Sequence, residues 1–348
     1  MARPDWDIAE GTQVVMVTGM HRSGTSMLMR IINLLGMEIG GHLVPPLPRN
    51  NETGFWEHEH LVEINEAMLE HFASGHLSLA DLPEEYLESP ATQRFQEWAW
   101  GILRRDFGKV PCWGVKDPRI ARLVPFWRET LARLGGNPVW VIVLRNPVEV
   151  AASLEQRNGI TRERALLLWL KYNLEAERNT RGLPRAFVHY PDVLADWKTA
   201  LRHVAKRTGC VWPRSYEAAE ARVAEFIRPE LKHQEAAEMQ AAFGVLSPWM
   251  QRTFQALKDG CRGSGEVDTA VLDSVWRDFS AINVPLQEEI DRLREINAKQ
   301  AEDIQTFRKH LELMQGSTSW RVTSPLRRVK CVARHLGKKE KTDMRTGT

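Results

Sequence analysis

The sequence lacks the paired cysteines and the long apolar segments that identify several classes of protein. Its four cysteines form no C-x-x-C pair, which argues against a zinc site and against a disulfide framework. No apolar run approaches the ~20 residues that a membrane-spanning helix needs. Residues 1–11 contain acids in place of the apolar core of a signal peptide. We therefore expect a soluble, reduced, cytoplasmic protein.

A strong net charge is also absent. The 47 Lys and Arg residues against 45 Asp and Glu residues give a formal net charge of +2, which argues against a nucleic-acid-binding protein. The chain has 348 residues, of which 43% are hydrophobic and 26% charged, as in ordinary globular proteins. This length suits one α/β domain of roughly 250 residues with an appendage.

The most informative segment is the turn at residues 19–26, which reads Gly-Met-His-Arg-Ser-Gly-Thr-Ser. It joins the β-branched run Val14–Thr18 to an amphipathic helix that we expect to end near Gly36. Backbone N–H groups in such a turn, with the positive end of a helix dipole, form an anion site that phosphate commonly occupies. The alternative is a turn that binds nothing. The residues expected to hold the anion are Arg22, Ser23, Gly24, Thr25 and Ser26.

This turn differs from a Walker A loop. Gly19 and Gly24 have the required separation, but Thr25 stands where the lysine should be, and Arg22 supplies the positive charge. No Walker-B carboxylate is apparent, so a magnesium-dependent NTPase is disfavoured and no metal is expected.

Apolar runs alternate with helical patterns over the first two hundred residues. The predicted strands are Val14–Thr18, Cys112–Lys116, Val139–Leu144 and Ala186–Tyr190. The predicted helices between them include Glu57–Phe72, Ala91–Phe107 and Val148–Arg157. This alternation predicts an α/β fold with a P-loop-like parallel sheet flanked by helices. Such sheets bind ligands at the carboxyl ends of their strands, where the turn at 19–26 falls.

A second anion site is predicted at the end of the third strand. Arg145 leaves the strand, Pro147 and Glu149 suit the first turn of a helix, and Ser153 lies about two turns further on. An arginine fork and a hydroxyl together suit a phosphate monoester. Two anion sites at neighbouring strand ends indicate one ligand with two separate phosphates, for which 3′-phosphoadenosine 5′-phosphosulfate (PAPS) is suitable.

In these motifs the chain resembles the PAPS-dependent sulfotransferases, in particular their bacterial branch. Residues 19–26 resemble the 5′-phosphosulfate loop, with Arg22 where many relatives have lysine. The segment from Arg145 to Ser153 is similar to the 3′-phosphate motif, including its eight-residue step from Arg to Ser. The resemblance covers roughly residues 12–235.

Two further segments carry the resemblance. Trp113–Arg119, which contains Lys116, resembles the segment that presents a basic residue near the donor sulfonate. Residues 226–233, which contain Lys232, are loosely similar to a basic segment late in the bacterial branch, and Lys232 is given no role.

The resemblance implies metal-independent transfer of a sulfuryl group from PAPS to a hydroxyl acceptor. Arg22 and Lys116 would stabilise the charge on the leaving phosphate oxygen. Sulfotransferases use glutamate or histidine as the base. Glu57 is the first choice here, followed by His58 and then Glu52. The alternative for Glu57 is an acid that only complements a helix dipole.

A carbohydrate or polysaccharide is the favoured acceptor. Aromatic residues near the predicted cleft could stack on sugars, namely Phe55, Trp56, Trp113, Phe126 and Trp127. The segment that begins at Ser317 also resembles tails on bacterial surface-polysaccharide enzymes. Two other functions stay open. One is a P-loop-type small-molecule kinase that needs ATP and magnesium, and the other is a non-catalytic scaffold of a surface-polysaccharide complex.

The C-terminal part has a different pattern. Apolar or amide side chains recur in alternating steps of four and three, at Leu286, Ile290, Leu293, Asn297, Gln300, Ile304, Phe307, Leu311 and Met314. This pattern predicts a coiled coil that makes a homo-oligomer through residues 286–314 and leaves dimer and trimer open. A helix packed on the domain is the alternative.

From Trp320 to the end there are nine Lys or Arg residues against two acids. Such a tail could contact anionic lipid at the inner membrane face, and a merely solvated tail is the alternative. The expected organisation is thus an α/β domain at 12–280, a coiled coil at 285–315 and a basic tail at 316–348.

Overall fold

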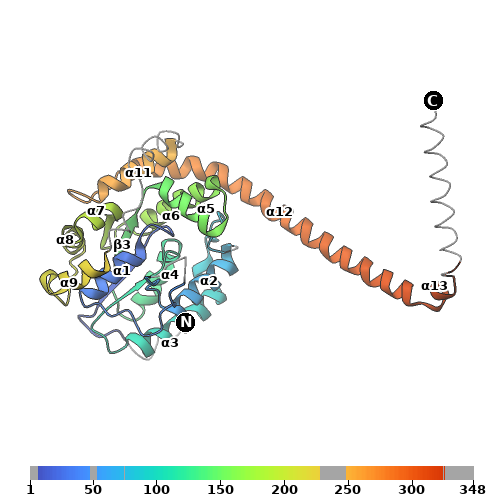
Figure 1. Ribbon diagram of the computed structural model, residues 1–348, viewed down its shortest axis with the longest axis horizontal. Coiled ribbons are helices and arrows are strands. Elements are labelled where there is room, and N and C mark those ends of the chain that lie inside the picture. Colours follow the sequence, from blue (N-terminus) through green and yellow to red (C-terminus); the bar gives the residue numbers. More distant parts are fainter. Residues whose placement is uncertain (1–6, 48–52, 74, 228–247, 324, 326–348) are drawn as a thin grey trace. The chain divides into compact units, whose positions relative to one another are not determined.

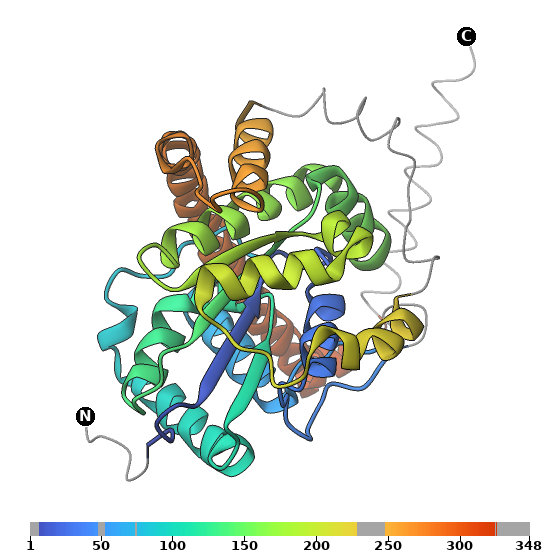
Figure 2. The same cartoon turned by 90° about the vertical axis from the view of Figure 1, so that its left-hand side faces the viewer.

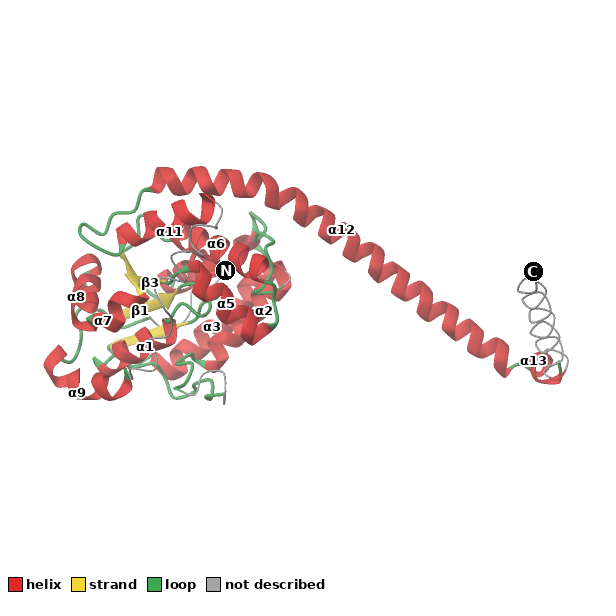
Figure 3. Ribbon diagram, turned by 45° about the horizontal axis from the view of Figure 1, so that its top comes forward, coloured by secondary structure: helices red, strands yellow, loops and turns green. Residues whose placement is uncertain are grey.

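The computed structural model describes residues 7–47, 53–73, 75–227, 248–323 and 325. The chain divides into two compact units, Met1–Val284 and Pro285–Thr348. The first unit is a parallel β-sheet with helices on both faces (Figures 1 and 3). The predicted α/β class is confirmed.

The sheet has the strand order β2-β1-β3-β4, and all pairings in it are parallel (Figure 2). Its strands are β1 (Gln13–Thr18), β2 (Cys112–Lys116), β3 (Val139–Leu144) and β4 (Arg185–His189). Each lies within one residue of its prediction. One residue was assigned to the wrong type of element: Tyr190 was expected to end β4 and instead begins the helix α7 (Tyr190–Ala195). Pro191 follows it directly, and proline suits the first turn of a helix.

The helices cover most of the remaining described chain. Their bounds are α1 (Thr25–Leu34), α2 (Glu59–Ala73), α3 (Pro90–Phe107), α4 (Ile120–Ala132), α5 (Pro147–Asn158), α6 (Arg162–Asn179), α7 (Tyr190–Ala195), α8 (Trp197–Thr208), α9 (Tyr216–Phe226), α11 (Pro248–Gly260), α12 (Thr269–Gly316) and α13 (Thr318–Val322), with a 3₁₀ turn η1 (Tyr86–Glu88).

Alternate side chains of each strand pack on opposite faces of the sheet, as a period of two requires. In β1, Val14 and Met16 join a core cluster formed with α2 to α6, α11 and the start of α12. Val15 and Val17 join a second cluster formed with α1, α8 and α9. Burial on both faces explains why the strands read as continuous apolar runs.

The carboxyl ends of β1, β2 and β3 lie together at one edge of the sheet. Val17 pairs with Lys116, and Thr18 pairs with Ile142. The segments that leave these strands are the turn at 19–26, the segment after Lys116 and the turn into α5. The three motifs predicted to bind the donor therefore meet at this edge.

The second unit contains the C-terminal part of α12, which was expected as a coiled-coil helix from residue 285. The helix begins earlier, at Thr269, and continues through Pro285. Leu272, Val275 and Phe279 are buried in the first unit. Packing against the α/β domain therefore stabilises the first turns of the helix, and the heptad pattern, which begins only at Leu286, gave no sign of them. Within the described residues, none of the helices is long and apolar enough to cross a bilayer.

Candidate active site

The turn between β1 and α1 is tight and depends on two glycines. Gly19 has a φ of 141°, and a Cβ there would lie 2.4 Å from the carbonyl oxygen of Val143 in β3. Gly24 has a φ of 92°, and a Cβ there would lie 2.0 Å from the Tyr190 ring. Gly24 is also the N-cap of α1. Because the first amides of a helix have no intrahelical acceptor, the turn presents N–H groups and a positive dipole end.

Hydroxyl groups line this turn. Ser23 is fully buried, and its Oγ has no hydrogen-bond partner among the described residues. An unsatisfied buried hydroxyl costs about 1–3 kcal/mol, so it favours an incoming acceptor oxygen. Thr25 is also buried, and Ser26 accepts a hydrogen bond from Lys116 Nζ at 3.1 Å. The donor set of the turn suits a phosphate.

Arg22 connects the turn to α5. Its backbone has a φ of 69°, in the left-handed region, and its Nε donates to Ser153 Oγ at 2.8 Å. Arg145 Nη1 donates to the Arg22 carbonyl oxygen at 3.2 Å. The contacts join residues that are 131 and 123 positions apart in the sequence. The two predicted phosphate motifs are therefore in direct contact.

Arg145 is held in place from several sides. Its Nε donates to Glu149 Oε2 at 2.6 Å, and its guanidinium lies 4.6 Å from the centre of the Tyr190 ring. Its carbonyl oxygen accepts from Trp169 Nε1 at 3.0 Å. Glu149 was interpreted from the sequence only as a complement to the helix dipole, and no sequence feature pointed to Tyr190. Both fix the orientation of the arginine fork.

Lys116 and Glu57 form a buried ion pair next to the turn. Lys116 Nζ lies 2.5 Å from Glu57 Oε1, and it also donates to the Phe55 carbonyl oxygen at 3.0 Å. With the bond to Ser26, all three of its N–H groups have an acceptor. Burial raises the pKa of the Glu57 carboxyl above its ordinary value, and the Lys116 ammonium opposes part of that rise.

The segment after Lys116 is fixed by a buried network that the sequence did not indicate. Asp117 Oδ1 accepts from Arg119 Nη1 at 2.8 Å, and Asp117 Oδ2 accepts from Asn65 Nδ2 at 2.8 Å. Asn65 in turn accepts from Trp127 Nε1 at 2.8 Å. Arg119 also pairs with Glu66. This network joins the end of β2 to α2 and α4, and so it fixes the backbone that carries Lys116.

His58 lies in a different cluster from its neighbour Glu57. Its Nε2 is 2.9 Å from Asp106 Oδ2 in α3, and its ring packs on Phe107. Burial lowers the pKa of His58, although the Asp106 carboxylate opposes this. Lys116 is thus paired with Glu57, and the structure does not bring His58 to it. Glu52 and Lys232 lie outside the described residues.

His21, inside the turn, was not singled out from the sequence. Its Nε2 is buried and has no hydrogen-bond partner among the described residues. The ring centre lies 5.2 Å from that of His76 and 5.7 Å from that of Tyr172. Burial and the nearby Arg119 hold the pKa of His21 well below its ordinary value, so the imidazole is neutral at neutral pH.

The charges around the turn are mainly positive. Burial lowers the pKa of Arg22, and the neighbouring Arg157 and Arg145 lower it further. Arg157 reaches the same area, 5.7 Å from the centre of the Phe55 ring. A cationic group becomes harder to protonate when other cations surround it, and an anion bound among them removes this penalty. The electrostatics therefore favour an anionic ligand.

Four of the five aromatic residues expected to stack on sugars are buried: Phe55 is 8% exposed, and the other three lie in the core. Trp113, Phe126 and Trp127 are at most 1% exposed, so they cannot contact a ligand in this conformation. Trp56 is half-buried, with the Arg30 guanidinium 4.3 Å from its ring centre. The expectation that these residues contact a sugar was wrong, because it was based only on their positions in the sequence. Helices cover both faces of the sheet, so aromatic residues in and next to the strands become buried.

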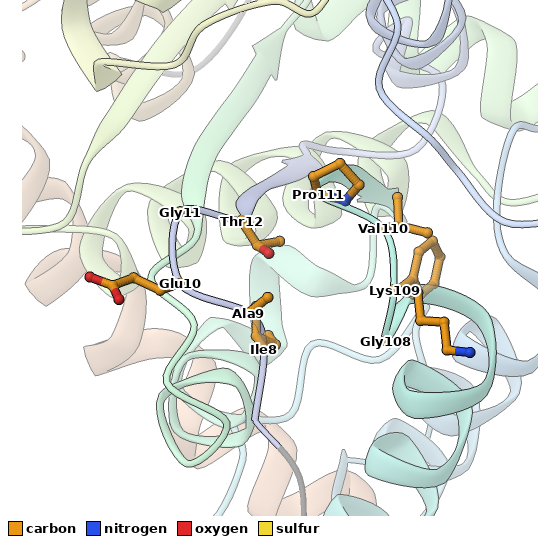
Figure 4. Close-up of a pocket in the computed structure, with 10 residues that line it drawn as sticks. Ile8, Ala9, Glu10, Gly11, Thr12, Gly108, Lys109, Val110 and Pro111 are labelled. Carbon is orange, nitrogen blue, oxygen red and sulfur yellow. The ribbon is translucent and has the colours of Figure 1, made fainter.

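A hollow of about 170 Å³ lies at the opposite, amino edge of the sheet (Figure 4). It is lined by residues 8–12, which precede β1, and by residues 107–111, which precede β2. Glu10 and Lys109 are its only ionisable residues. None of the predicted site residues lines it.

No family model matches the chain, and no curated protein matches it. Among solved structures, the chain is similar to the sulfotransferase domain of an olefin synthase from Synechococcus PCC 7002, with 17% identity, a TM-score of 0.42, and coverage of 75% of this chain and 98% of that one. It is also similar to a sulfotransferase domain from the curacin biosynthetic pathway, with 15% identity, a TM-score of 0.38, and coverage of 71% and 98%. A sulfotransferase from Mycobacterium tuberculosis H37Rv gives 16% identity, a TM-score of 0.36, and coverage of 71% and 77%.

Proposed function

We propose that the protein transfers a sulfuryl group from PAPS to a hydroxyl group of an acceptor, with a carbohydrate or polysaccharide as the acceptor class. The observation that carries the proposal is the contact between the two phosphate motifs, in which Arg22 bonds to Ser153 and Arg145 bonds to the Arg22 carbonyl. Two phosphates on one ribose need anion sites this close together. A nucleoside triphosphate, whose phosphates form one chain, does not need the second site.

The residues of the site fit the donor on their own chemistry. The amides of residues 23–26, the Ser23 hydroxyl and the Arg22 side chain would hold the 5′-phosphate. Arg145 and Ser153 would hold the 3′-phosphate. To do so, Ser153 and Arg22 exchange their mutual hydrogen bond for bonds to the nucleotide.

In the reaction, the acceptor oxygen attacks sulfur in line with the bridging phosphate oxygen. The new O–S bond forms, the old S–O bond breaks, and its electron pair goes to the phosphate. Arg22 and Lys116 would stabilise this developing charge. The acceptor proton would pass to the carboxylate of Glu57, whose raised pKa makes it a better base than an exposed glutamate. Of the two candidate bases with described positions, Glu57 is supported by its contact with Lys116.

Calorimetry with 3′-phosphoadenosine 5′-phosphate and with ATP plus magnesium tests the donor. We expect tight binding of the bisphosphate without metal and weak binding of ATP. A preference for ATP with magnesium would favour the kinase, and binding of neither would favour the scaffold.

A second experiment tests the base. Glu57→Gln should retain binding of the bisphosphate and lose turnover by about 10²–10⁴-fold, the usual contribution of general base catalysis. The acceptor itself is found by screening glycans with labelled donor. Near-normal turnover of Glu57→Gln would exclude Glu57 as the base.

Cytoplasmic localisation and contact of the basic tail with the inner membrane face stay predictions. Most of that tail, residues 326–348, lies outside the described residues.

A further inference from the structure

The part of α12 in the second unit carries a row of exposed apolar side chains. From Pro285 to Gly316 every residue except the half-buried Gln287 is at least 36% exposed in the single chain. The apolar members of the row are Leu286, Ile290, Leu293, Ile304, Phe307, Leu311 and Met314, with Phe307 71% exposed. Such a continuous apolar row on a soluble helix indicates that another surface covers it.

The row has the composition of a two-stranded coiled coil. In heptad notation, the a positions are Ile290, Asn297, Ile304 and Leu311. The d positions are Leu286, Leu293, Gln300, Phe307 and Met314. Isoleucine at a, leucine at d and a single asparagine at a favour a parallel dimer over a trimer.

The residues beside the row identify the partner as a second copy of this chain. In a parallel, in-register pair, each g residue faces the e residue five positions later on the other helix. Here Glu289 faces Arg294, and Asp303 faces Arg308. The g–e pair between these two is apolar, since Ile296 faces Ala301. By symmetry the two charge pairs occur twice.

The same positions disfavour an antiparallel pair. There e residues face e residues, and a pair that overlaps over residues 286–314 would place Arg294 against Arg308. In the single chain, Arg294 pairs with Asp291 at 2.9 Å and Glu289 with Arg292 at 3.4 Å. These exposed contacts within one helix are weak, so they do not prevent pairing between chains.

The polar core residues fix the register. In the parallel, unshifted pair, Asn297 meets Asn297 of the second copy, and Gln300 meets Gln300. A shift of one heptad would instead place Asn297 against Ile290 or Ile304. We infer that the chain forms a parallel, in-register homodimer through residues 286–314. This inference does not depend on the proposed catalytic function.

Charge exchange in the full chain tests the partner. Light scattering should give a dimer for the natural chain. Glu289→Lys with Asp303→Lys makes all four g and e charges positive, and Arg294→Glu with Arg308→Glu makes them negative. Each double variant should shift to monomer, and their mixture should restore a dimer. Circular dichroism of each variant checks that the α/β domain is folded. A natural chain that is monomeric or trimeric, or double variants that stay dimeric when folded, would overturn the inference.

Disulfide trapping tests the orientation. In a Cys331→Ser background, Leu286→Cys at a d position should form a disulfide between chains, and Arg292→Cys at an outward c position should form little. In an antiparallel pair a positions face d positions, and the alignment that places Arg294 against Arg308 would place residue 290 against residue 314 of the other chain. Trapping only in a mixture of Ile290→Cys and Met314→Cys chains would therefore refute the parallel arrangement.

Discussion

Replacing Arg145 with lysine tests the proposed 3′-phosphate site separately from the proposed 5′-phosphate site. Lysine keeps the positive charge and loses the planar fork, so it cannot make two parallel bonds to one phosphate. Hydrogen bonds to charged groups contribute about 1.5–3 kcal/mol, which corresponds to a roughly 10–150-fold weaker affinity. We expect the variant to bind 3′-phosphoadenosine 5′-phosphate less tightly by a factor in this range.

The comparison ligand is adenosine 5′-phosphate, which has no 3′-phosphate. Arg145 also donates to the Arg22 carbonyl oxygen, so its loss loosens the turn and weakens both ligands. A bond to a neutral acceptor contributes only about 0.5–1.5 kcal/mol. The ratio of the Kd for adenosine 5′-phosphate to the Kd for 3′-phosphoadenosine 5′-phosphate removes this shared effect. In Arg145→Lys we expect this ratio to fall by about tenfold or more.

Calorimetric titration of both ligands measures that ratio. Glu149→Gln should give a smaller fall, because it leaves the guanidinium in place and weakens its orientation. Arg181→Lys is a matched control, since Arg181 also pairs with a carboxylate four residues away, Glu177, and lies just after the end of α6. An unchanged ratio in Arg145→Lys would refute the assignment of the 3′-phosphate to this residue.

Three further predictions concern charge and packing. Glu57 must be ionised to act as a base and its pKa is raised, so the acid limb of the pH profile of kcat/KM should lie above the ordinary glutamate value of 4.5. In Lys116→Met, which loses the opposing ammonium, this limb should move to higher pH, and a limb that stays or moves to lower pH would contradict the pairing of Lys116 with Glu57. Burial lowers the pKa of His58 in the folded chain, so the unfolded chain binds the extra proton as pH falls below about 6.5 and stability is lost there; urea titrations from pH 7 to 5 should show a slope smaller by up to about 1.4 kcal/mol per pH unit in His58→Gln. Gly24→Ala should cost about 2–6 kcal/mol by thermal denaturation, from a positive φ and overlap with Tyr190, whereas Gly159→Ala, with a φ of 64° and open space around it, should cost only the backbone part; equal losses would show that the Tyr190 contact is unimportant.

The sequence predicts well those features that depend on neighbouring residues. Apolar runs bounded by glycine and proline predicted the strands, and strand polarity brought the turn at 19–26 and Arg145 to one edge. The eight-residue step from Arg145 to Ser153 also depends only on local structure. Arg145 lies after the end of β3, and Ser153 lies about two turns into α5, as the sequence predicted.

Features that depend on tertiary packing were missed. Glu57 and Lys116 are 59 positions apart, and neither residue's neighbours indicate that they pair. Tyr190 approaches Gly24 only because β4 lies beside β3. His58 differs from Glu57 by one position, yet it turns to α3 and bonds to Asp106, because successive side chains in an extended segment point in opposite directions.

Helix α5 carries both Glu149, which orients Arg145, and Ser153, which bonds to Arg22. If the proposed donor site is correct, a small tilt of this helix would move the groups that hold both phosphates of the nucleotide at once. Substitutions beneath it, at Val150 or Leu154 in the core, could therefore weaken affinity for the donor without touching the ligand.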